Sequence, residues 1–293
     1  MRMEAAVRDF TTDQSCMALN AVTVRKQGDL QAIIDACLRH KIPAIVPWRE
    51  QVAELGLRAT ANAIERAGLI VPGYCRGGMM VADESRLSEA RDDNRRAVDE
   101  AAELGAQCLV LVVGGLPQFS RPGSAPSKDI EAARALVADE IARLLPYAVK
   151  CGVRLALEPL HPVHAASRAC VNTLGQALDL CDAIDRTGQG RLGVAVDVYH
   201  TWWDPDLANQ IARAGAARLH AFHVCDWLVP TRNPLTDRGM MGDGVIDIPR
   251  IRGWIESAGY QGFCEVEILS DVWWARSMDD TLRACVRAMR EAV

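Results

Sequence analysis

The sequence predicts a single α/β domain folded as a (β/α)8 barrel, on the strength of three observations. Short apolar runs alternate with helical segments about eight times along the 293 residues. Such alternation is typical of a parallel sheet covered by helices, and eight units at this length favour a closed barrel over an open doubly wound sheet. No break in composition indicates a linker between two domains. We therefore expect an N-terminal arm over residues 1–14 and the barrel over residues 15–293.

The expected strands are short, largely apolar runs bounded by turn-forming or charged residues. The most hydrophobic run is 108–113. Pro43 stands near the start of the second run, where it cannot donate a ladder hydrogen bond. In chain order the expected strands cover residues 16–22, 42–46, 69–73, 108–113, 153–157, 192–196, 217–223 and 262–267.

Between the strands, apolar residues recur at the spacing of an amphipathic helix. Ser85 is the expected N-cap of one helix, whose first turns carry the acidic residues that a helix N-terminus favours. Two long segments, 114–127 and 226–244, are expected to be loops. The expected helices cover residues 30–38, 52–67, 85–104, 130–148, 173–184, 206–214, 249–258 and 277–293.

Composition argues against several classes of function. A net charge of −5 gives no support for binding nucleic acid, which usually needs a basic field. The ten cysteines are scattered without a C-x-x-C pair, as expected for small buried residues in a reducing cytoplasm. The N-terminus lacks the apolar region of a signal peptide, and no apolar run reaches the roughly 18 residues of a membrane span. We expect a cytoplasmic protein with no membrane partner.

Four side chains that can bind a metal follow four consecutive expected strands: Glu158, Asp197, His223 and Glu267. In barrel enzymes the chemistry sits at the carboxyl ends of the strands, and neighbouring strands lie only about 4.8 Å apart. Three carboxylates and one imidazole form an oxygen-rich site that suits Mn²⁺ or Mg²⁺, with Co²⁺ or Zn²⁺ as alternatives. Because three buried carboxylates would repel one another without a cation, their convergence itself indicates an ion.

Two choices within this set depend on strand geometry. His220 lies three residues before His223, so the two face opposite ways on an ideal strand, and His220 is expected to be structural. Glu265 and Glu267 share a strand face. Glu267 is the expected ligand because it is nearer the carboxyl end.

The motifs around these residues resemble those of the sugar phosphate isomerase/epimerase superfamily, the xylose isomerase-like TIM barrels. The resemblance spans about residues 15–290 and is specific mainly over 147–270. The order of motifs is most similar to that of inosose isomerases and ketose 3-epimerases. The motifs are a fifth-strand signature at 147–159, D-x-x-H at 197–200, H-x-x-D at 223–226, Asp237-Arg238, a glycine-rich turn at 242–247 and G-Y-x-G-x(4)-E at 259–267.

This resemblance implies a divalent ion held by the four side chains, and two glutamates, Glu158 and Glu267, that act on opposite faces of a substrate carbon. One glutamate would remove a proton alpha to a carbonyl and the other would return one. A carboxylate can do this only if the resulting negative charge is stabilised, which a Lewis-acidic ion on the carbonyl oxygen achieves. The expected protein is a metal-dependent isomerase or epimerase of a keto-sugar or inosose, active in carbohydrate metabolism as a homodimer or homotetramer.

The resemblance also implies substrate contacts for His200 and Arg238. The alternatives are that His200 orients a metal ligand and that Arg238 forms a loop salt bridge. Trp202 and Trp48 are candidates to line the pocket or to stack on the C–H face of a sugar, and His161, in the loop after Glu158, is a further candidate.

Three rival functions use the same fold. A lyase or dehydratase would share the proton abstraction and then eliminate from a keto-sugar, inosose or 3-keto-glycoside. An apurinic-site endonuclease would need a three-metal cluster with further histidines, yet no histidine occurs after His223 or at the expected ends of strands three and four. A sugar-binding barrel without catalysis is disfavoured because all four metal positions are present. Arg76 and Arg238 are candidates for binding phosphate, but no glycine-rich helix start accompanies them, which favours an unphosphorylated substrate.

Overall fold

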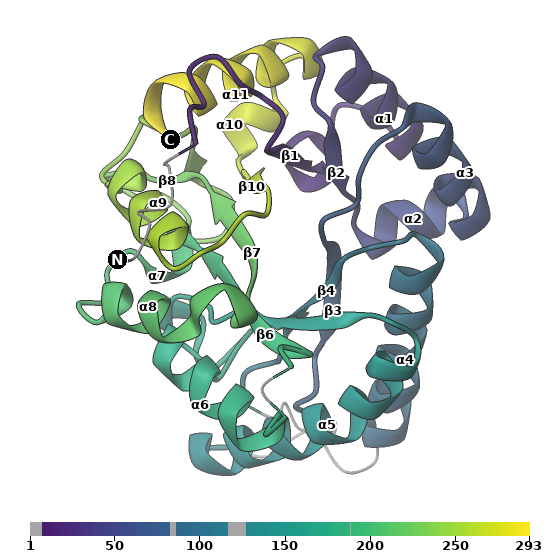
Figure 1. Ribbon diagram of the computed structural model, residues 1–293, viewed down its shortest axis with the longest axis vertical. Coiled ribbons are helices and arrows are strands. Elements are labelled where there is room, and N and C mark those ends of the chain that lie inside the picture. Colours follow the sequence, from purple (N-terminus) through teal and green to yellow (C-terminus); the bar gives the residue numbers. More distant parts are fainter. Residues whose placement is uncertain (1–7, 83–85, 117–126, 188) are drawn as a thin grey trace, which may run out of the picture.

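Eight parallel strands form the wall of a barrel in the computed structural model (Figure 1), which describes residues 8–82, 86–116, 127–187 and 189–293. Their order around the wall is β2-β1-β10-β7-β6-β5-β4-β3. The predicted barrel fold is therefore confirmed. The strands are β1 (Met17–Asn20), β2 (Ala44–Val46), β3 (Tyr74–Gly78), β4 (Cys108–Val112), β5 (Arg154–Leu157), β6 (Leu192–Asp197), β7 (Leu219–Val224) and β10 (Cys264–Val266).

The two ends of this sheet, β2 and β3, meet through isolated hydrogen bonds. The N–H of Ile70 donates to the carbonyl of Pro43 at 3.0 Å, and the N–H of Cys75 donates to that of Pro47 at 3.1 Å. Each proline lacks a donor of its own but still offers a carbonyl acceptor. The prolines just before and just after β2 are therefore compatible with closure of the barrel.

Helices surround the strands on the outside (Figure 1). Several begin at a side chain that accepts a hydrogen bond from a backbone N–H in the first turn, as Asp29, Thr173 and Ser277 do. No described helix combines the length and apolar character needed to cross a membrane. The longer helices are α1 (Leu30–Arg39), α2 (Arg49–Leu55), α3 (Leu57–Ala67), α4 (Leu87–Glu103), α5 (Ile130–Lys150), α6 (Leu174–Ile184), α8 (Leu207–Arg218), α9 (Ile248–Ser257) and α11 (Met278–Ala292).

The apolar residues of the barrel form two separate clusters. On β4, Leu109 and Leu111 belong to the large cluster that the helices cover, whereas Cys108 and Val110 belong to a small cluster inside the wall. This is the two-residue alternation of a strand. All ten cysteines are unpaired and eight of them are buried, in keeping with their predicted role as small apolar residues.

Two predicted elements are wrong in their boundaries. The third strand is β3 at Tyr74–Gly78, later than the expected 69–73, because Pro72 cannot donate to the ladder. The expected helix at 52–67 is two helices, α2 and α3, divided at Gly56, whose φ of 93° departs from helical geometry. The expected N-cap Ser85 lies outside the described residues, as do residues 1–7 of the proposed arm. The domain boundary at residue 15 therefore stays a prediction.

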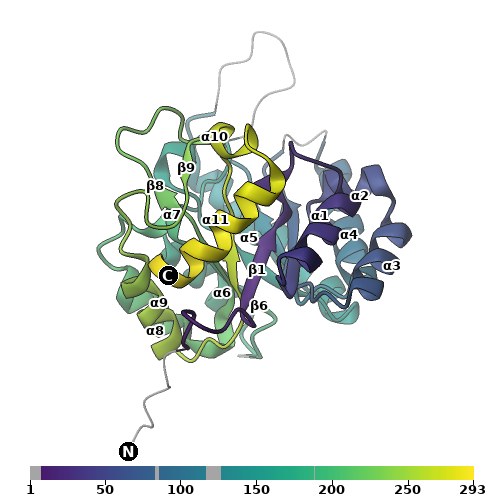
Figure 2. The same cartoon turned by 90° about the horizontal axis from the view of Figure 1, so that it is seen from above.

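The expected loop at 226–244 contains a hairpin of β8 (Asp226–Trp227) and β9 (Arg238–Gly239). The buried carboxylate of Asp226 organises it by accepting hydrogen bonds from the N–H groups of Gly242, Gly244 and Ile246 at 2.9–3.0 Å. In Figure 2 the hairpin lies at one end of the barrel together with the short helix α10 (Asp271–Trp274). The N–H of Arg238 donates to the carbonyl of Leu269 just before α10, which joins the hairpin to the barrel mouth.

Candidate metal centre

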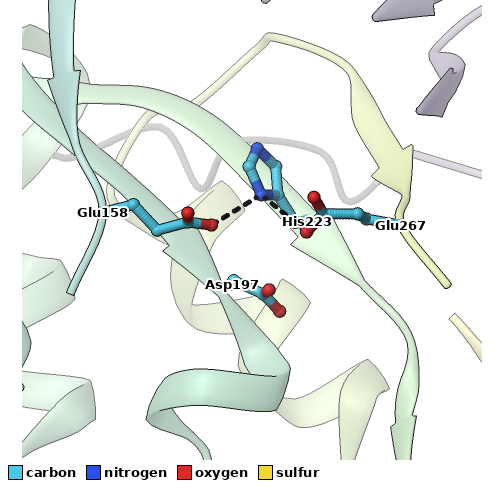
Figure 3. A group of neighbouring side chains, drawn as sticks. All are labelled: Glu158, Asp197, His223 and Glu267. Atoms are coloured by element: carbon cyan, nitrogen blue, oxygen red, sulfur yellow. Dashed lines mark hydrogen bonds and ion pairs between the residues drawn. The ribbon is translucent and has the colours of Figure 1, made fainter. Parts of the chain in front are cut away.

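Four buried side chains converge at the carboxyl ends of four neighbouring strands, as the sequence predicts (Figure 3). Glu158 follows β5, Asp197 is the last residue of β6, His223 is next to last in β7, and Glu267 follows β10. One potential ligand atom from each lies within 4.8 Å of the others. The three carboxylates and the imidazole can therefore surround a single ion.

Strand alternation explains why these side chains point inward. The residues two positions before the first three members of the cluster are Ala156, Ala195 and Ala221, which belong to the apolar cluster inside the wall. Because every second residue of a strand faces the same way, the residues that follow them also face inward. On β10 the corresponding position is Glu265, so a second carboxylate lies next to Glu267.

Glu265 is a member of the site that sequence reasoning missed. His223 Nδ1 lies 3.2 Å from Glu158 Oε1 and 3.6 Å from Glu267 Oε2, whereas its Nε2 lies 3.3 Å from Glu265 Oε2. Nδ1 is thus the nitrogen that faces the cluster, and Glu265 stands on the other side of the ring. The sequence signal that could have identified Glu265 as part of the site is the strand face that it shares with Glu267.

Asn20, at the end of β1, is a second missed residue. Its side-chain N–H donates to Glu265 Oε1 at 2.7 Å and to Glu267 Oε1 at 3.2 Å. Its side-chain oxygen accepts from Trp48 Nε1 at 2.6 Å. Asn20 therefore fixes both glutamates of β10, and Trp48 contacts the cluster through it.

The acids of the cluster differ in their affinity for protons. Burial raises the pKa of Asp197 to about 7, although the nearby Arg238 lowers it. Burial likewise raises the pKa of Glu265 to about 7, although the nearby His223 lowers it. Burial also raises the pKa of Glu267, but Arg238 and His223 outweigh it and bring this pKa to about 2. Burial lowers the pKa of His223, yet attraction to Glu265 and hydrogen bonds to the other glutamates raise it well above its usual range. The site therefore favours positive charge at its centre.

Arg238 is buried beside this cluster and contacts it directly. Its Nη1 donates to Asp197 Oδ2 at 2.8 Å and to Glu267 Oε2 at 3.1 Å. Its guanidinium lies 4.6 Å from the centre of the Tyr199 ring, which provides a cation–π contact. Arg238 thus forms salt bridges and lines the cavity at the barrel mouth, and its contact with substrate stays a prediction.

His200 connects Arg238 to the loop after β5. Its Nε2 lies 3.1 Å from Arg238 Nη2, and its Nδ1 accepts from the N–H of His161 at 3.2 Å. Burial, with repulsion from Arg238, lowers the pKa of His200 well below its usual range. His200 is therefore neutral near pH 7 and touches a partner of the cluster, as the orienting role would require.

The remaining predicted contact residues lie in different places. Trp48 lines the cavity at the barrel mouth, whereas His161 and Trp202 are not among its lining residues. His161 stacks on Trp227 with ring centres 4.8 Å apart, and Trp202 lies 6.0 Å from the same ring. Both belong to an aromatic group beside the cavity, and their contact with substrate stays a prediction.

The space between the side chains at the mouth, part of it open to solvent, amounts to about 480 Å³. Residues of the cluster and their partners line it together with basic side chains that sequence reasoning had not brought together. The polar lining residues are Arg76, Glu158, His164, Arg168, His200, Arg238 and Glu267.

The family model of the xylose isomerase-like TIM barrel matches residues 33–291 of the chain. Two curated relatives are similar over shorter stretches. An inosose isomerase from Halalkalibacterium halodurans is 26% identical over 145 residues, which is 48% of this chain and 49% of that protein. A fructoselysine 3-epimerase from Escherichia coli O157:H7 is 22% identical over 192 residues, 66% of this chain and 63% of that protein. The matches thus span from about half to less than two thirds of the length of these relatives.

Two solved structures show the same fold. The structure of protein SMc04130 from Sinorhizobium meliloti 1021 has a TM-score of 0.90 and 54% sequence identity, covering 96% of this chain and 99% of that one. A structure of the IOLI protein with a bound zinc atom has a TM-score of 0.74 and 17% identity, covering 94% of this chain and 96% of that one. At this identity the second likeness concerns the fold.

Proposed function

Because the chain belongs to the xylose isomerase-like TIM barrel family, we propose that it is a divalent-metal-dependent isomerase or epimerase of a keto-sugar or inosose. The observation that carries this proposal is the convergence of Glu158, Asp197, His223 and Glu267 within 4.8 Å of one another. The names of the two curated relatives, an isomerase and a 3-epimerase, support the same class of reaction.

The donor set fits a divalent ion. Three carboxylates and His223 Nδ1 face one centre, and two of the buried acids, Asp197 and Glu265, have raised pKa values. The oxygen-rich set favours Mn²⁺, with Mg²⁺, Co²⁺ and Zn²⁺ as alternatives. A solved structure of the same fold, that of the IOLI protein, holds a zinc atom, which supports a divalent metal in this chain.

When bound, the ion would polarise the substrate carbonyl and so acidify the neighbouring C–H. Glu158 and Glu267 reach the cluster from β5 and β10, which are separated in the sheet by β6 and β7 (Figure 3). In our proposal one carboxylate removes the proton from one face of the carbon and the other delivers a proton to the opposite face. His200 and Arg238 orient the substrate oxygens, and Trp48 covers an apolar face of the sugar.

Deuterium exchange tests this proposal at its first chemical step. The metal-loaded protein is incubated in D₂O with a panel of keto-sugars and inososes, and we expect deuterium to enter the carbon next to the ketone. Glu158→Gln and Glu267→Gln should abolish exchange. Glu131→Gln is the matched control because that side chain is 78% exposed and belongs neither to the cluster nor to the lining of the cavity. Full exchange in either active-site variant would contradict the role given to that glutamate.

The products of the same incubation separate isomerisation from elimination. An isomerase or epimerase returns a sugar of unchanged mass apart from deuterium. A lyase, which shares the proton abstraction, releases a product that has lost water or an alcohol. Mass spectrometry distinguishes the two, and elimination as the sole outcome would replace the proposed reaction by the lyase.

A further inference from the structure

The cavity that holds part of the acidic cluster is also lined by basic side chains. Arg76 is in β3, and Arg168 lies in the loop after β5; both line the cavity. In the sheet β3 is separated from β5 by β4, whereas the acidic cluster extends from β5 to β10. A molecule in the cavity would therefore lie within reach of both the carboxylates and the two arginines.

Neither arginine has an acidic partner within 4.0 Å among the described residues. By contrast, Arg49 pairs with Asp93 and Glu100 at 2.7–2.8 Å. The Nε of Arg76 is buried and has no hydrogen-bond partner. Burial, with repulsion from Arg76 and Arg238, lowers the pKa of Arg168. Both arginines are half-buried, and cations brought together away from water are unfavourable unless a ligand compensates the charge.

His164 provides independent support for a ligand in the same cavity. Only 8% of this residue is exposed, and its Nε2 is buried without a hydrogen-bond partner. The ring lines the same cavity and lies 6.1 Å from the ring of His200. Burial lowers the pKa of His164, so the ring is neutral near pH 7 and can donate or accept one further hydrogen bond.

We propose that the substrate carries an anionic group, a carboxylate or a phosphate, that binds between Arg76, Arg168 and His164. Guanidinium groups suit this chemistry because their N–H groups match the paired oxygens of such anions. The inference builds on the proposed function, since the same molecule presents its ketone to the acidic cluster. It makes the substrate class a keto-sugar acid, which agrees with the unphosphorylated substrate that the sequence favours, or a keto-sugar phosphate, which does not.

The test compares ketoses that share one ketone and differ only at the terminal carbon, such as fructose, fructuronate and fructose 6-phosphate. Deuterium exchange by the metal-loaded full chain gives kcat/KM for each sugar. We expect kcat/KM for one anionic sugar to exceed that for the neutral sugar by roughly 10- to 100-fold. The preferred anion tells a carboxylate substrate from a phosphate substrate. Equal values for all three would overturn the anion site and leave the proposed function intact.

Variants test whether the two arginines cause the preference for an anionic sugar. Arg76→Gln and Arg168→Gln should each reduce the ratio of anionic to neutral kcat/KM by about tenfold or more, and the corresponding lysine variants should retain part of it. Arg58→Gln is the control, because its side chain is 89% exposed on α3. An unchanged ratio in both glutamine variants would overturn the assignment. If the glutamine variants fail to fold, the lysine variants and the substrate preference of the natural protein still test whether the cavity binds an anionic group.

Calorimetry separates this inference from the proposed function. If no ketose exchanges deuterium, the proposed function is contradicted, but the binding of fructuronate and fructose 6-phosphate can still be titrated. Binding that is lost or weakened in Arg76→Gln and Arg168→Gln, but not in Arg58→Gln, would support the anion site by itself. Absence of binding to the natural protein would overturn it.

Discussion

Among single residues, Glu265 and His223 form the pair that decides how the imidazole faces the cluster. Glu265 stands 3.3 Å from Nε2, on the side of the ring away from the other carboxylates. Asn20 in turn holds Glu265 by a 2.7 Å hydrogen bond. A carboxylate behind a metal-binding histidine fixes the orientation and the tautomer of its ring.

Replacing Glu265 by Gln should weaken metal binding by roughly 10- to 100-fold, because the side chain keeps its shape but loses the charge that holds the ring. Calorimetric titration with Mn²⁺ measures the effect. Glu131→Gln, on an exposed helix surface, should bind the metal as the natural protein does. Equal affinity in all three proteins would show that Glu265 does not support the site.

Removing Arg238 should destabilise the metal-free protein more than the metal-loaded one. Arg238→Met leaves the buried carboxylates of Asp197 and Glu267 without their cation, and breaking a buried ion pair costs about 3–5 kcal/mol. A divalent ion bound between the same carboxylates would restore part of this loss. Urea unfolding with a chelator and with Mn²⁺ compares the two states. A loss of equal size in both would mean that the metal does not compensate for the arginine.

Much of the cluster was predictable from the sequence at this scale, because strand alternation and barrel topology are local rules. Glu158 and Asp197 follow from a strand that ends in an acid. The choice of a single carboxylate from β10 left out Glu265, although both have the same strand parity. His164 was recognisable as a histidine of the loop after Glu158, but its place at the cavity beside Arg168 could not be found in this way. The path of their loop is set by long-range hydrogen bonds such as Cys170 N–H to the carbonyl of Gly114.

At the scale of elements, His220 links two strands that are not neighbours. Its Nδ1 lies 3.1 Å from the carbonyl of Leu155 on β5, across the intervening strand β6. The ring fits there because Gly193 of β6 has no side chain; a Cβ at that position would lie 2.5 Å from the ring. The imidazole therefore stabilises the packing of β5, β6 and β7 at the amino-terminal side of the cluster.

This histidine should make the protein sensitive to mild acid. Burial lowers the pKa of His220 to about 4, below the usual value of about 6.5, so protonation favours the unfolded chain. The stabilising effect of the neutral ring is complete above pH 6.5 and is lost as the pH falls toward 4. Between pH 7 and pH 5 the loss is about 2 kcal/mol.

Urea unfolding at pH 7 and pH 5 measures this loss. In His220→Gln the difference in free energy of unfolding between the two pH values should be smaller by about that amount. The other titrating groups contribute to both proteins alike, so the comparison isolates His220. The same difference in the natural protein and the variant would contradict the assignment.

The elements that were hardest to predict are those whose boundaries depend on distant partners. The run that precedes β3 reads as a strand, but Pro72 lies within it and the ladder to β4 begins after it. The hairpin of β8 and β9 has no apolar alternation to reveal it. Its shape comes from Asp226, whose hydrogen bonds reach residues up to Ile246.

For the molecule as a whole, the cluster joins four consecutive strands of the wall, from β5 to β10. An ion bound to the folded protein alone adds stability by mass action, about 2.7 kcal/mol at a concentration 100 times its dissociation constant. Chelation should therefore lower the free energy of unfolding, and Mn²⁺ should restore it. Asp197→Asn should abolish most of this response, whereas Glu131→Gln should keep it. If the free energy of unfolding of the natural protein did not change when Mn²⁺ is added, the result would argue against a metal held by these strands.

The attachment of the β8–β9 hairpin to Asp226 has a consequence for how this protein can be altered. Four main-chain donors end on that one carboxylate, and none of them belongs to the outer segment at 229–233, whose Val229 is 71% exposed. Arg232 of this segment is different, because its N–H and its guanidinium donate to the buried Asp237 next to Arg238. The exposed stretch at 229–230 can therefore be exchanged or tagged while the return of the chain to Arg238 keeps its course. It offers a place for grafting new specificity onto the barrel mouth without rebuilding the centre beneath it.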